Sequence, residues 1–233
     1  MCTVTYLPVK PTLHFITSSR DEHLLRPAAL PPKIYKERGR ALLFPQDPVG
    51  HGTWMAASSG GAVCLLNGAF VPHQRKNTYK HSRGLVPLHF FEFDSVNQFA
   101  GHYAFEGIEP FTLIIVQEGQ LHELKWDEAR VHLKKLPAGR PHIWASVTLY
   151  TPQVIRSRKR WFKKWLDTST YPDAKEILHF HKYYGEADRE NGLVIERSSG
   201  LKTISITSLK RTDISTTMIH EDLINRSINE AVL

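Results

Sequence analysis

The chain opens with Met-Cys-Thr-Val-Thr-Tyr-Leu-Pro-Val-Lys-Pro-Thr-Leu-His-Phe-Ile-Thr-Ser-Ser-Arg-Asp-Glu (residues 1–22), a run that combines a cysteine at position 2 with two strand-like segments. Residues 3–7 and residues 13–18 are two strand-like runs, separated by a short segment that contains two prolines. Such a pair predicts a β-hairpin. In a hairpin the end of the second strand returns to the start of the first. We therefore expect Arg20 and Asp21 to lie beside Cys2.

Cys2 brings nucleophilic chemistry to this place. The initiator methionine is normally removed when the next side chain is small, so we expect the mature chain to begin at Cys2. One residue then carries a thiol and a free α-amine, whose ordinary pKa values are about 8.5 and about 7.7–8.0. Such an amine can act as the base for its own thiol. Arg20 would favour the thiolate, and Asp21 would accept hydrogen bonds from the amine.

The residues around this hairpin resemble a known family. Ser19-Arg20-Asp21-Glu22 resembles the Asn-Arg-Asp-Glu signature of the NRDE family, also called the transport-and-Golgi-organisation-2 family, with Ser19 in place of asparagine. Gly52-Thr53-Trp54 matches a Gly-Thr-Trp element of that family, and residues 62–67 resemble its strand ending in Thr-Asn. The resemblance covers about the first 90 residues and returns at residues 143–152.

This resemblance implies a fold and a set of site residues. The family is similar to N-terminal-nucleophile (Ntn) hydrolases such as choloylglycine hydrolases and penicillin V acylases. It therefore implies an α+β fold, the four-layer α-β-β-α sandwich of two antiparallel sheets. It also implies that Cys2, Arg20, Asp21 and Asn67 are catalytic. In the related acylases, one of the later strands begins with an arginine. Lys202 is the nearest match to that arginine in this chain, and the resemblance implies a substrate-binding role for it. Lysine keeps the charge but lacks the bidentate fork of arginine.

Length and composition limit the other possibilities. With 233 residues, 41% hydrophobic content and no linker-like stretch, we expect one domain over residues 1–233. The sequence has no apolar run long enough to span a membrane and no secretory signal, so a cytoplasmic location is the default expectation. Two cysteines cannot form a disulfide framework. The net charge of +7 fits acidic ligands or nucleic acid, and it equally fits an ordinary soluble surface.

The rest of the chain reads as strands and helices in an α+β mixture. Residues 26–48 hold five prolines and are predicted to be a surface loop that gates a substrate. Residues 53–57 and 62–66 predict a second hairpin, paired with the first. The remaining predicted strands cover residues 111–116, 121–126, 143–150 and 202–208, and one more ends the chain within residues 216–233. The predicted helices cover residues 85–91, 96–103, 153–167 and 174–184.

Three features allow two interpretations each. Asn67 precedes Gly68, a pair typical of turns, and its amide is also suited to holding an oxyanion. Six basic residues of the helix over residues 153–167 form either a solvated face or an anion-binding patch. We expect the solvated face and no nucleic-acid partner. His179 and His181 lie two positions apart on a helix and cannot easily share a metal, so we expect neither metal nor cofactor.

Two functions remain in competition. The first is a cysteine-dependent hydrolase of linear, non-peptide amides that acts on a small-molecule amide substrate. The second is a non-enzymatic binding or trafficking protein, because members of the NRDE family are linked to Golgi organisation and to haem handling. The sequence supports haem weakly, since it lacks a Cys-x-x-Cys-His motif. In the second case Cys2 is an ordinary residue near a chain end. The oligomeric state does not follow from the sequence.

Overall fold

The predicted first hairpin forms the centre of a sheet. In the computed structural model, which describes residues 3–169 and 173–233, β1 (Thr3–Lys10) runs antiparallel to β2 (Leu13–His23). The register places Thr3 opposite Ser19. Both strands gain an outer partner, since β10 pairs with β1 and β11 pairs with β2. β2 therefore lies inside the sheet, and its last residues, beyond Ser19, pair with β11.

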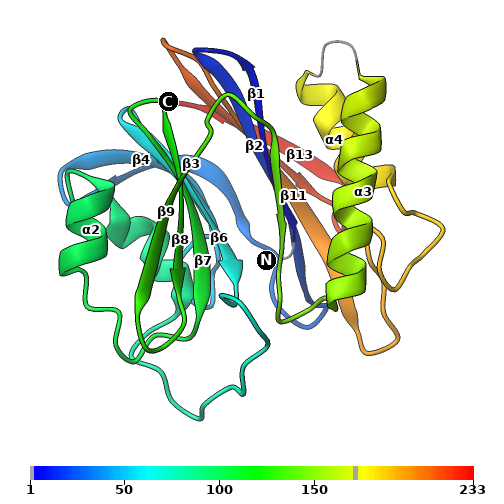
Figure 1. Cartoon of the computed structure of the whole chain (residues 1–233), viewed down its shortest axis with the longest axis horizontal. Coiled ribbons are helices and arrows are strands. Elements are labelled where there is room, and N and C mark those ends of the chain that lie inside the picture. The colour runs from blue at the N-terminus through cyan, green and yellow to red at the C-terminus, as the bar shows by residue number, and fades with distance from the viewer. Residues whose placement is uncertain (1–2, 170–172) are drawn as a thin grey trace.

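Two antiparallel sheets face each other among the described residues (Figure 1). Sheet A has the order β10-β1-β2-β11-β12-β13. Its further strands are β10 (His142–Ala145), β11 (Leu201–Arg211), β12 (Thr216–Asp222) and β13 (Ser227–Val232). Sheet B has the order β3-β4-β5-β6-β7-β8-β9. Its strands are β3 (Leu30–Glu37), β4 (Arg40–Gln46), β5 (Met55–Ser58), β6 (Gly61–Asn67), β7 (Phe111–Gln117), β8 (Gln120–Trp126) and β9 (Val131–Leu136).

Helices cover the outer face of each sheet. The 3-10 turn η1 (Arg83–Leu85), α1 (Val86–Phe90) and α2 (Val96–His102) lie on sheet B, while α3 (Pro152–Thr168) and α4 (Ala174–Tyr183) lie on sheet A (Figure 1). The order helices, sheet A, sheet B, helices is the predicted four-layer α-β-β-α sandwich, and the α+β class is confirmed. Among the described residues, no helix combines the length and the apolar character that crossing a membrane requires.

Alternation along the first hairpin builds two of the cores. Val4, Tyr6 and Ile16 point toward sheet B and pack with residues of β4 to β7. Leu7 and Phe15 point the other way and pack under α3 and α4. Successive side chains of a strand face opposite sides, so a strand between two layers is apolar on both. Burying each of these side chains contributes about 1.5–3 kcal/mol.

The structure corrects two predictions about sheet B. Residues 26–48 are not a loop, since β3 and β4 form a hairpin there. Pro31 and Pro32 were part of the reason for expecting a loop. Proline is nevertheless tolerated in an edge strand, and β3 is an edge strand of sheet B. Both prolines fall where the β3–β4 register shifts. The hairpin of β5 and β6 does form but does not pair with the first hairpin. It lies in the opposite sheet, with both of its faces buried.

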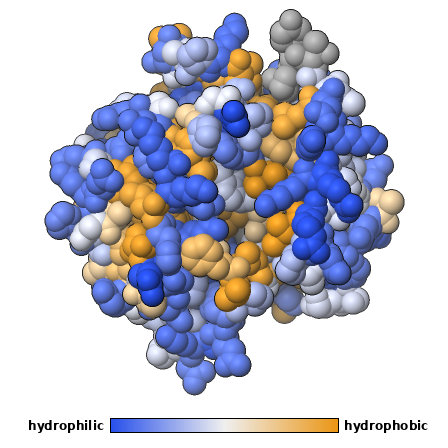
Figure 2. Space-filling model, viewed as in Figure 1, coloured by the Kyte–Doolittle hydropathy of each residue, from blue (hydrophilic) through white to orange (hydrophobic). Residues whose placement is uncertain are grey.

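The other predicted elements form with shifted bounds. The helices over residues 153–167 and 174–184 are confirmed as α3 and α4, and the strands over residues 111–116 and 121–126 as β7 and β8. The strand predicted to reach residue 150 ends at Ala145. β9 was not predicted, and β12 and β13 are two strands where the sequence predicted one within residues 216–233. On the face in Figure 2, hydrophilic side chains lie over α3 and hydrophobic ones surface in separate patches.

Candidate functional site

A cleft of about 500 Å³ opens where β2 ends, beside β6 and the segment of residues 75–84. Arg20 and Asn67, two of the expected site residues, both line this cleft. Trp54 and Leu65 contribute apolar surface to the cleft. Most of the other side chains that line it are polar or charged. A concave site with convergent polar groups is the usual form of a small-molecule site.

Arg20 lies in the wall of the cleft and is almost fully buried, with 5% of its side chain exposed. Its guanidinium carbon is 4.7 Å from the ring centroid of Trp54, which is cation–π geometry. Its Nη2 lies 3.6 Å from Glu22 Oε2 and 3.9 Å from Asp47 Oδ2. Asp47 is also bound by Arg26. This arrangement fixes the guanidinium at the end of β2.

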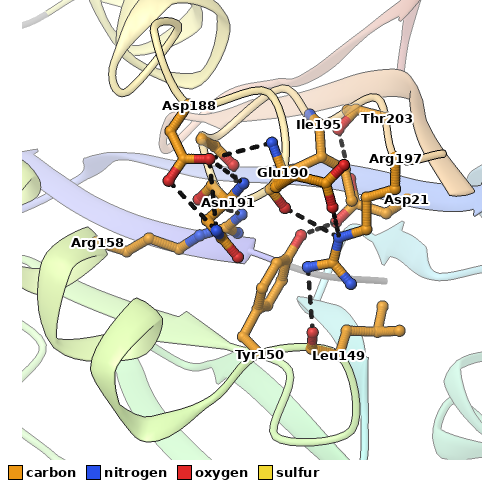
Figure 3. Close-up of polar contacts among 11 residues, drawn as sticks. Asp21, Leu149, Tyr150, Arg158, Asp188, Glu190, Asn191, Ile195, Arg197 and Thr203 are labelled. Carbon is orange, nitrogen blue, oxygen red and sulfur yellow. Dashed lines mark hydrogen bonds and ion pairs between the residues drawn. The ribbon is translucent and has the colours of Figure 1, made fainter.

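Asp21 points to the opposite face of sheet A, toward the helices. It is buried, and Thr203 Oγ1 donates a hydrogen bond to its Oδ1 at 2.5 Å. The hydroxyl of Tyr150 donates to its other oxygen (Figure 3). Thr203 lies directly opposite Asp21 on β11. The carboxylate is therefore held in place by two hydroxyl donors.

Arg158 of α3 is the largest fully buried side chain of the described residues. Its guanidinium donates to Thr3 Oγ1 and to the carbonyl oxygen of Gly192. Its guanidinium carbon lies 3.6 Å from the ring centroid of Tyr150. Arg197 approaches the same ring, at 5.3 Å, and donates to the carbonyl oxygen of Leu149 at 3.3 Å (Figure 3). Arg158 thus contacts both the first described residue of β1 and the tyrosine that binds Asp21.

His181 of α4 lies under the same part of sheet A and is fully buried. Its Nδ1 is 2.8 Å from Ser19 Oγ, and its Nε2 is 2.9 Å from Thr5 Oγ1. Burial, with a smaller contribution from the charge of Arg158, lowers the pKa of His181 to about 3. The imidazole is therefore neutral at ordinary pH and ties Ser19 to Thr5 across the hairpin. This contact gives a structural reason for a hydroxyl at position 19.

Asn67 occupies the last position of β6, and the backbone around it is firmly held. Ser146 Oγ donates to the Asn67 carbonyl oxygen at 2.9 Å, and Thr112 Oγ1 donates to the Gly68 carbonyl oxygen at 2.8 Å. Gly68 has a φ of +83°, which glycine adopts without strain. Its NH donates to the Pro110 carbonyl oxygen at 3.0 Å. Both interpretations from the sequence are therefore compatible, because Asn67 starts a turn and also lines the cleft.

The other expected site residues lie elsewhere. Cys2 falls outside the described residues, and the first described residue is its neighbour Thr3. Lys202 does not line the cleft, and its Nζ lies 2.8 Å from Glu196 Oε1. The other cysteine, Cys64, is buried between the sheets, and burial raises the pKa of its thiol to about 12. Across residues 3–169 and 173–233, no group of three His, Cys, Asp or Glu side chains is placed to hold a metal.

Sequence reasoning missed Arg158, Tyr150 and His181. Arg158 was assigned to the solvated face of its helix, which is wrong, because it is fully buried. A signal was present, since Val154, Arg158 and Phe162 follow each other at a spacing of four. Residues at that spacing share one helix face, so Arg158 belongs to the apolar stripe. An arginine in such a stripe needs buried acceptors, and the carbonyl oxygens of residues 191 and 192 supply them.

Fold and cleft define a class, a four-layer protein of two facing antiparallel sheets whose cleft opens at the end of the N-terminal hairpin. Residues 1–218 match the family model described as transport and Golgi organisation 2. The chain belongs to this family, as its Ser19-Arg20-Asp21-Glu22 run indicated. A search of the curated proteins finds no significant match to the chain.

Proposed function

We propose that this protein is a cysteine-dependent amidase of the Ntn type, with the thiol of Cys2 as nucleophile and its α-amine as base. The observation that carries this proposal is the placement of Thr3 opposite Ser19. The register sets the residue that follows Cys2 beside the end of β2, where Arg20 and Asp21 lie on opposite faces. Arg158 supports this arrangement because it binds Thr3 from the helix side.

In the proposed reaction, the thiolate sulfur of Cys2 attacks the amide carbonyl carbon, and the α-amine takes up the thiol proton. Asn67, which lines the cleft with Arg20, is suited to stabilise the oxyanion. The C–N bond then breaks, and the ammonium returns the proton to the leaving amine. A water molecule hydrolyses the resulting thioester, which releases a carboxylic acid and restores the thiol. Arg20 favours the thiolate, and Asp21 holds the ammonium form during the transfer.

The test is acylation of the purified protein by an activated ester, followed by intact mass and peptide mapping. We expect the protein to begin at Cys2, and one acyl group to appear on Cys2 and disappear on standing. The Cys2→Ala variant should take up no acyl group. Retention of Met1 in the native protein would remove the free amine and contradict the mechanism. In that case a non-enzymatic binding protein on the same fold becomes the better explanation.

A further inference from the structure

One wall of the cleft brings Arg83 next to the turn that carries Asn67. The carbonyl oxygen of Pro110 accepts a hydrogen bond from Arg83 Nη1 at 3.1 Å and another from Gly68 NH at 3.0 Å. Arg83 is held further by Glu109, with 3.2 Å between Nη2 and Oε2. Only 16% of its side chain is exposed. A guanidinium is therefore fixed beside the proposed oxyanion site.

The charge of this wall is not balanced by its own carboxylates. Glu109 is shared, because its Oε1 lies 3.1 Å from His73 Nε2. Arg75 lines the same cleft, is exposed, and has no ion-pair partner within the described part of the chain. Burial lowers the pKa of Arg83, Glu109 opposes this shift, and the nearby charge of Arg75 adds a smaller lowering. Two cations that line the same cleft, one of them without a carboxylate partner among the described residues, attract an anion to it.

The cleft as a whole carries the same imbalance. Its cationic side chains are Arg20, Arg26, Arg75, Lys76 and Arg83, and its carboxylates are Glu22, Asp47 and Glu109, so five positive charges face three negative ones. Arg20 and Arg26 both lie against Asp47, and Lys76 pairs with Glu128 at 3.0 Å. The uncompensated charge is thus localised at Arg75. Its planar fork suits a carboxylate or a phosphate, which it can bind through two hydrogen bonds.

We propose that Arg75 and Arg83 form an anion subsite, so that the substrate of this cleft carries a carboxylate or phosphate group. The identity of the bound molecule as a substrate rests on the proposed amidase function. The subsite itself rests on Arg83, which is fixed beside the Asn67 turn, and on Arg75, which lines the same cleft without an ion-pair partner among the described residues. A polar, anionic molecule also fits the lining of the cleft, where few side chains are apolar.

Two activated esters of equal chain length test the subsite. Para-nitrophenyl hexanoate is neutral, and para-nitrophenyl hydrogen adipate carries a terminal carboxylate. Acylation of Cys2 is followed by release of para-nitrophenolate and by intact mass, in the native protein, in Arg75→Gln and in Arg140→Gln. Arg140 is exposed and does not line the cleft, so its variant is a control of equal charge and size.

The adipate-to-hexanoate rate ratio should fall about tenfold in Arg75→Gln, the typical effect of losing one charge-assisted hydrogen bond. It should stay unchanged in Arg140→Gln. Equal ratios in all three proteins would overturn the subsite while the amidase proposal stands. Inorganic phosphate and adipate, added as competitors of the hexanoate ester, distinguish the two anions. The stronger inhibitor identifies the preferred group, and inhibition by neither would overturn the subsite.

Failure of both esters to acylate Cys2 would refute the amidase and leave the subsite to be judged by binding. Thermal unfolding with added phosphate or adipate serves this purpose, since a ligand of the folded state raises the melting temperature. A rise in the native protein and in Arg140→Gln that is lost in Arg75→Gln supports the subsite. The same response in all three proteins overturns it.

Discussion

The guanidinium of Arg158 stacks on the ring of Tyr150 at 3.6 Å, and Tyr150 donates its hydroxyl hydrogen to Asp21. The same guanidinium binds Thr3. One side chain of α3 therefore reaches both the start of β1 and, through Tyr150, the end of β2. The two strand ends are adjacent in sheet A, so Arg158 fastens them together from the helix side. Arg158 is a positioning residue in this arrangement.

Replacing Arg158 should destabilise the fold strongly. Arg158→Ala leaves the buried carbonyl oxygens of Asn191 and Gly192 without their donor and opens a cavity under Tyr150. We expect the free energy of unfolding to fall by about 2–5 kcal/mol, because a buried acceptor loses its donor and a large side chain leaves a cavity. Arg160→Ala, on the exposed face of the same helix, should change it by no more than about 0.5 kcal/mol. Urea unfolding measures both, and equal effects would refute the assignment.

Tyr150→Phe isolates the hydroxyl that binds Asp21. Phenylalanine keeps the ring under Arg158 and removes the hydroxyl that donates to the carboxylate. We expect a stability loss of about 1–3 kcal/mol, because the hydrogen bond is buried and its acceptor is charged. The pH dependence of Cys2 acylation should also shift, since a less firmly held Asp21 interacts differently with the α-amine. A stability loss with an unchanged pH profile would limit Tyr150 to a structural role.

Asp21→Asn tests the charge itself. If the α-amine is the base and the carboxylate holds it, the rate of Cys2 acylation should fall by about tenfold or more. The buried position of Asp21 changes the expected stability effect. An amide NH₂ would face either Thr203 or Tyr150, both of which donate to the carboxylate, so unfolding should become easier by about 1–3 kcal/mol. Normal acylation by a destabilised variant would show that Asp21 is a structural clamp.

The fold was largely readable from the sequence because its strands are short runs that are either alternating or continuously apolar, and turn residues separate them. Residues 3–7 and 13–18 predicted the central hairpin, and Phe111–Gln117 with Gln120–Trp126 another. The strands that were not predicted include the two edge strands of sheet B, whose composition is not typical of strands. Pro31 and Pro32 are in β3 and made this segment resemble a loop. An edge strand tolerates proline because the NH that proline lacks can be absent on its unpaired side. β9 is the opposite edge strand of sheet B, and none of its residues is fully buried. Its sequence therefore contains two lysines and shows no regular apolar alternation.

The site was only half readable. Arg20 and Asn67 line one cleft. Arg20 and Asp21 lie near the end of β2, as the hairpin pattern predicted, but their burial did not follow from that pattern. Both are nearly fully buried, because β11 extends far enough to cover the end of β2. Partners such as Tyr150 and Thr203 lie 129 and 182 positions from Asp21 along the chain. No local pattern connects residues that far apart.

The two cysteines should differ sharply in reactivity. Cys64 lies fully buried between the sheets, and burial raises its pKa to about 12, so almost none of it is thiolate at pH 8. Limiting iodoacetamide should therefore label Cys2 at least 100-fold faster than Cys64 in the folded protein, an order-of-magnitude estimate from that thiolate fraction. Peptide mapping by mass spectrometry gives the ratio. Labelling of Cys64 first would contradict its place in the core. Unfolding in urea should make the two rates similar.

Acid should destabilise the protein through His181. Its pKa is lowered from about 6.5 in an unfolded chain to about 3 in the fold, first by burial and then by Arg158. The unfolded state therefore binds one more proton between these values, so the stability contributed by the neutral imidazole is complete above about pH 6.5 and is lost as pH falls toward 3. Near pH 5, His181 alone should contribute a slope of about 1.4 kcal/mol per pH unit to the free energy of unfolding.

His181→Gln removes the titrating group while its amide can still reach one of the two hydroxyls, on Ser19 or Thr5. Urea unfolding at several pH values from 4 to 7 should show the slope of the variant reduced by about 1.4 kcal/mol per pH unit relative to the native protein. The residual slope has other sources, since burial also lowers the pKa of His14 and of His220 to about 4. His102→Gln, at an exposed position of α2, is the control for the same substitution outside the core. An unaltered slope in His181→Gln would mean that His181 is protonated inside the fold, with Ser19 and Thr5 both accepting its hydrogens.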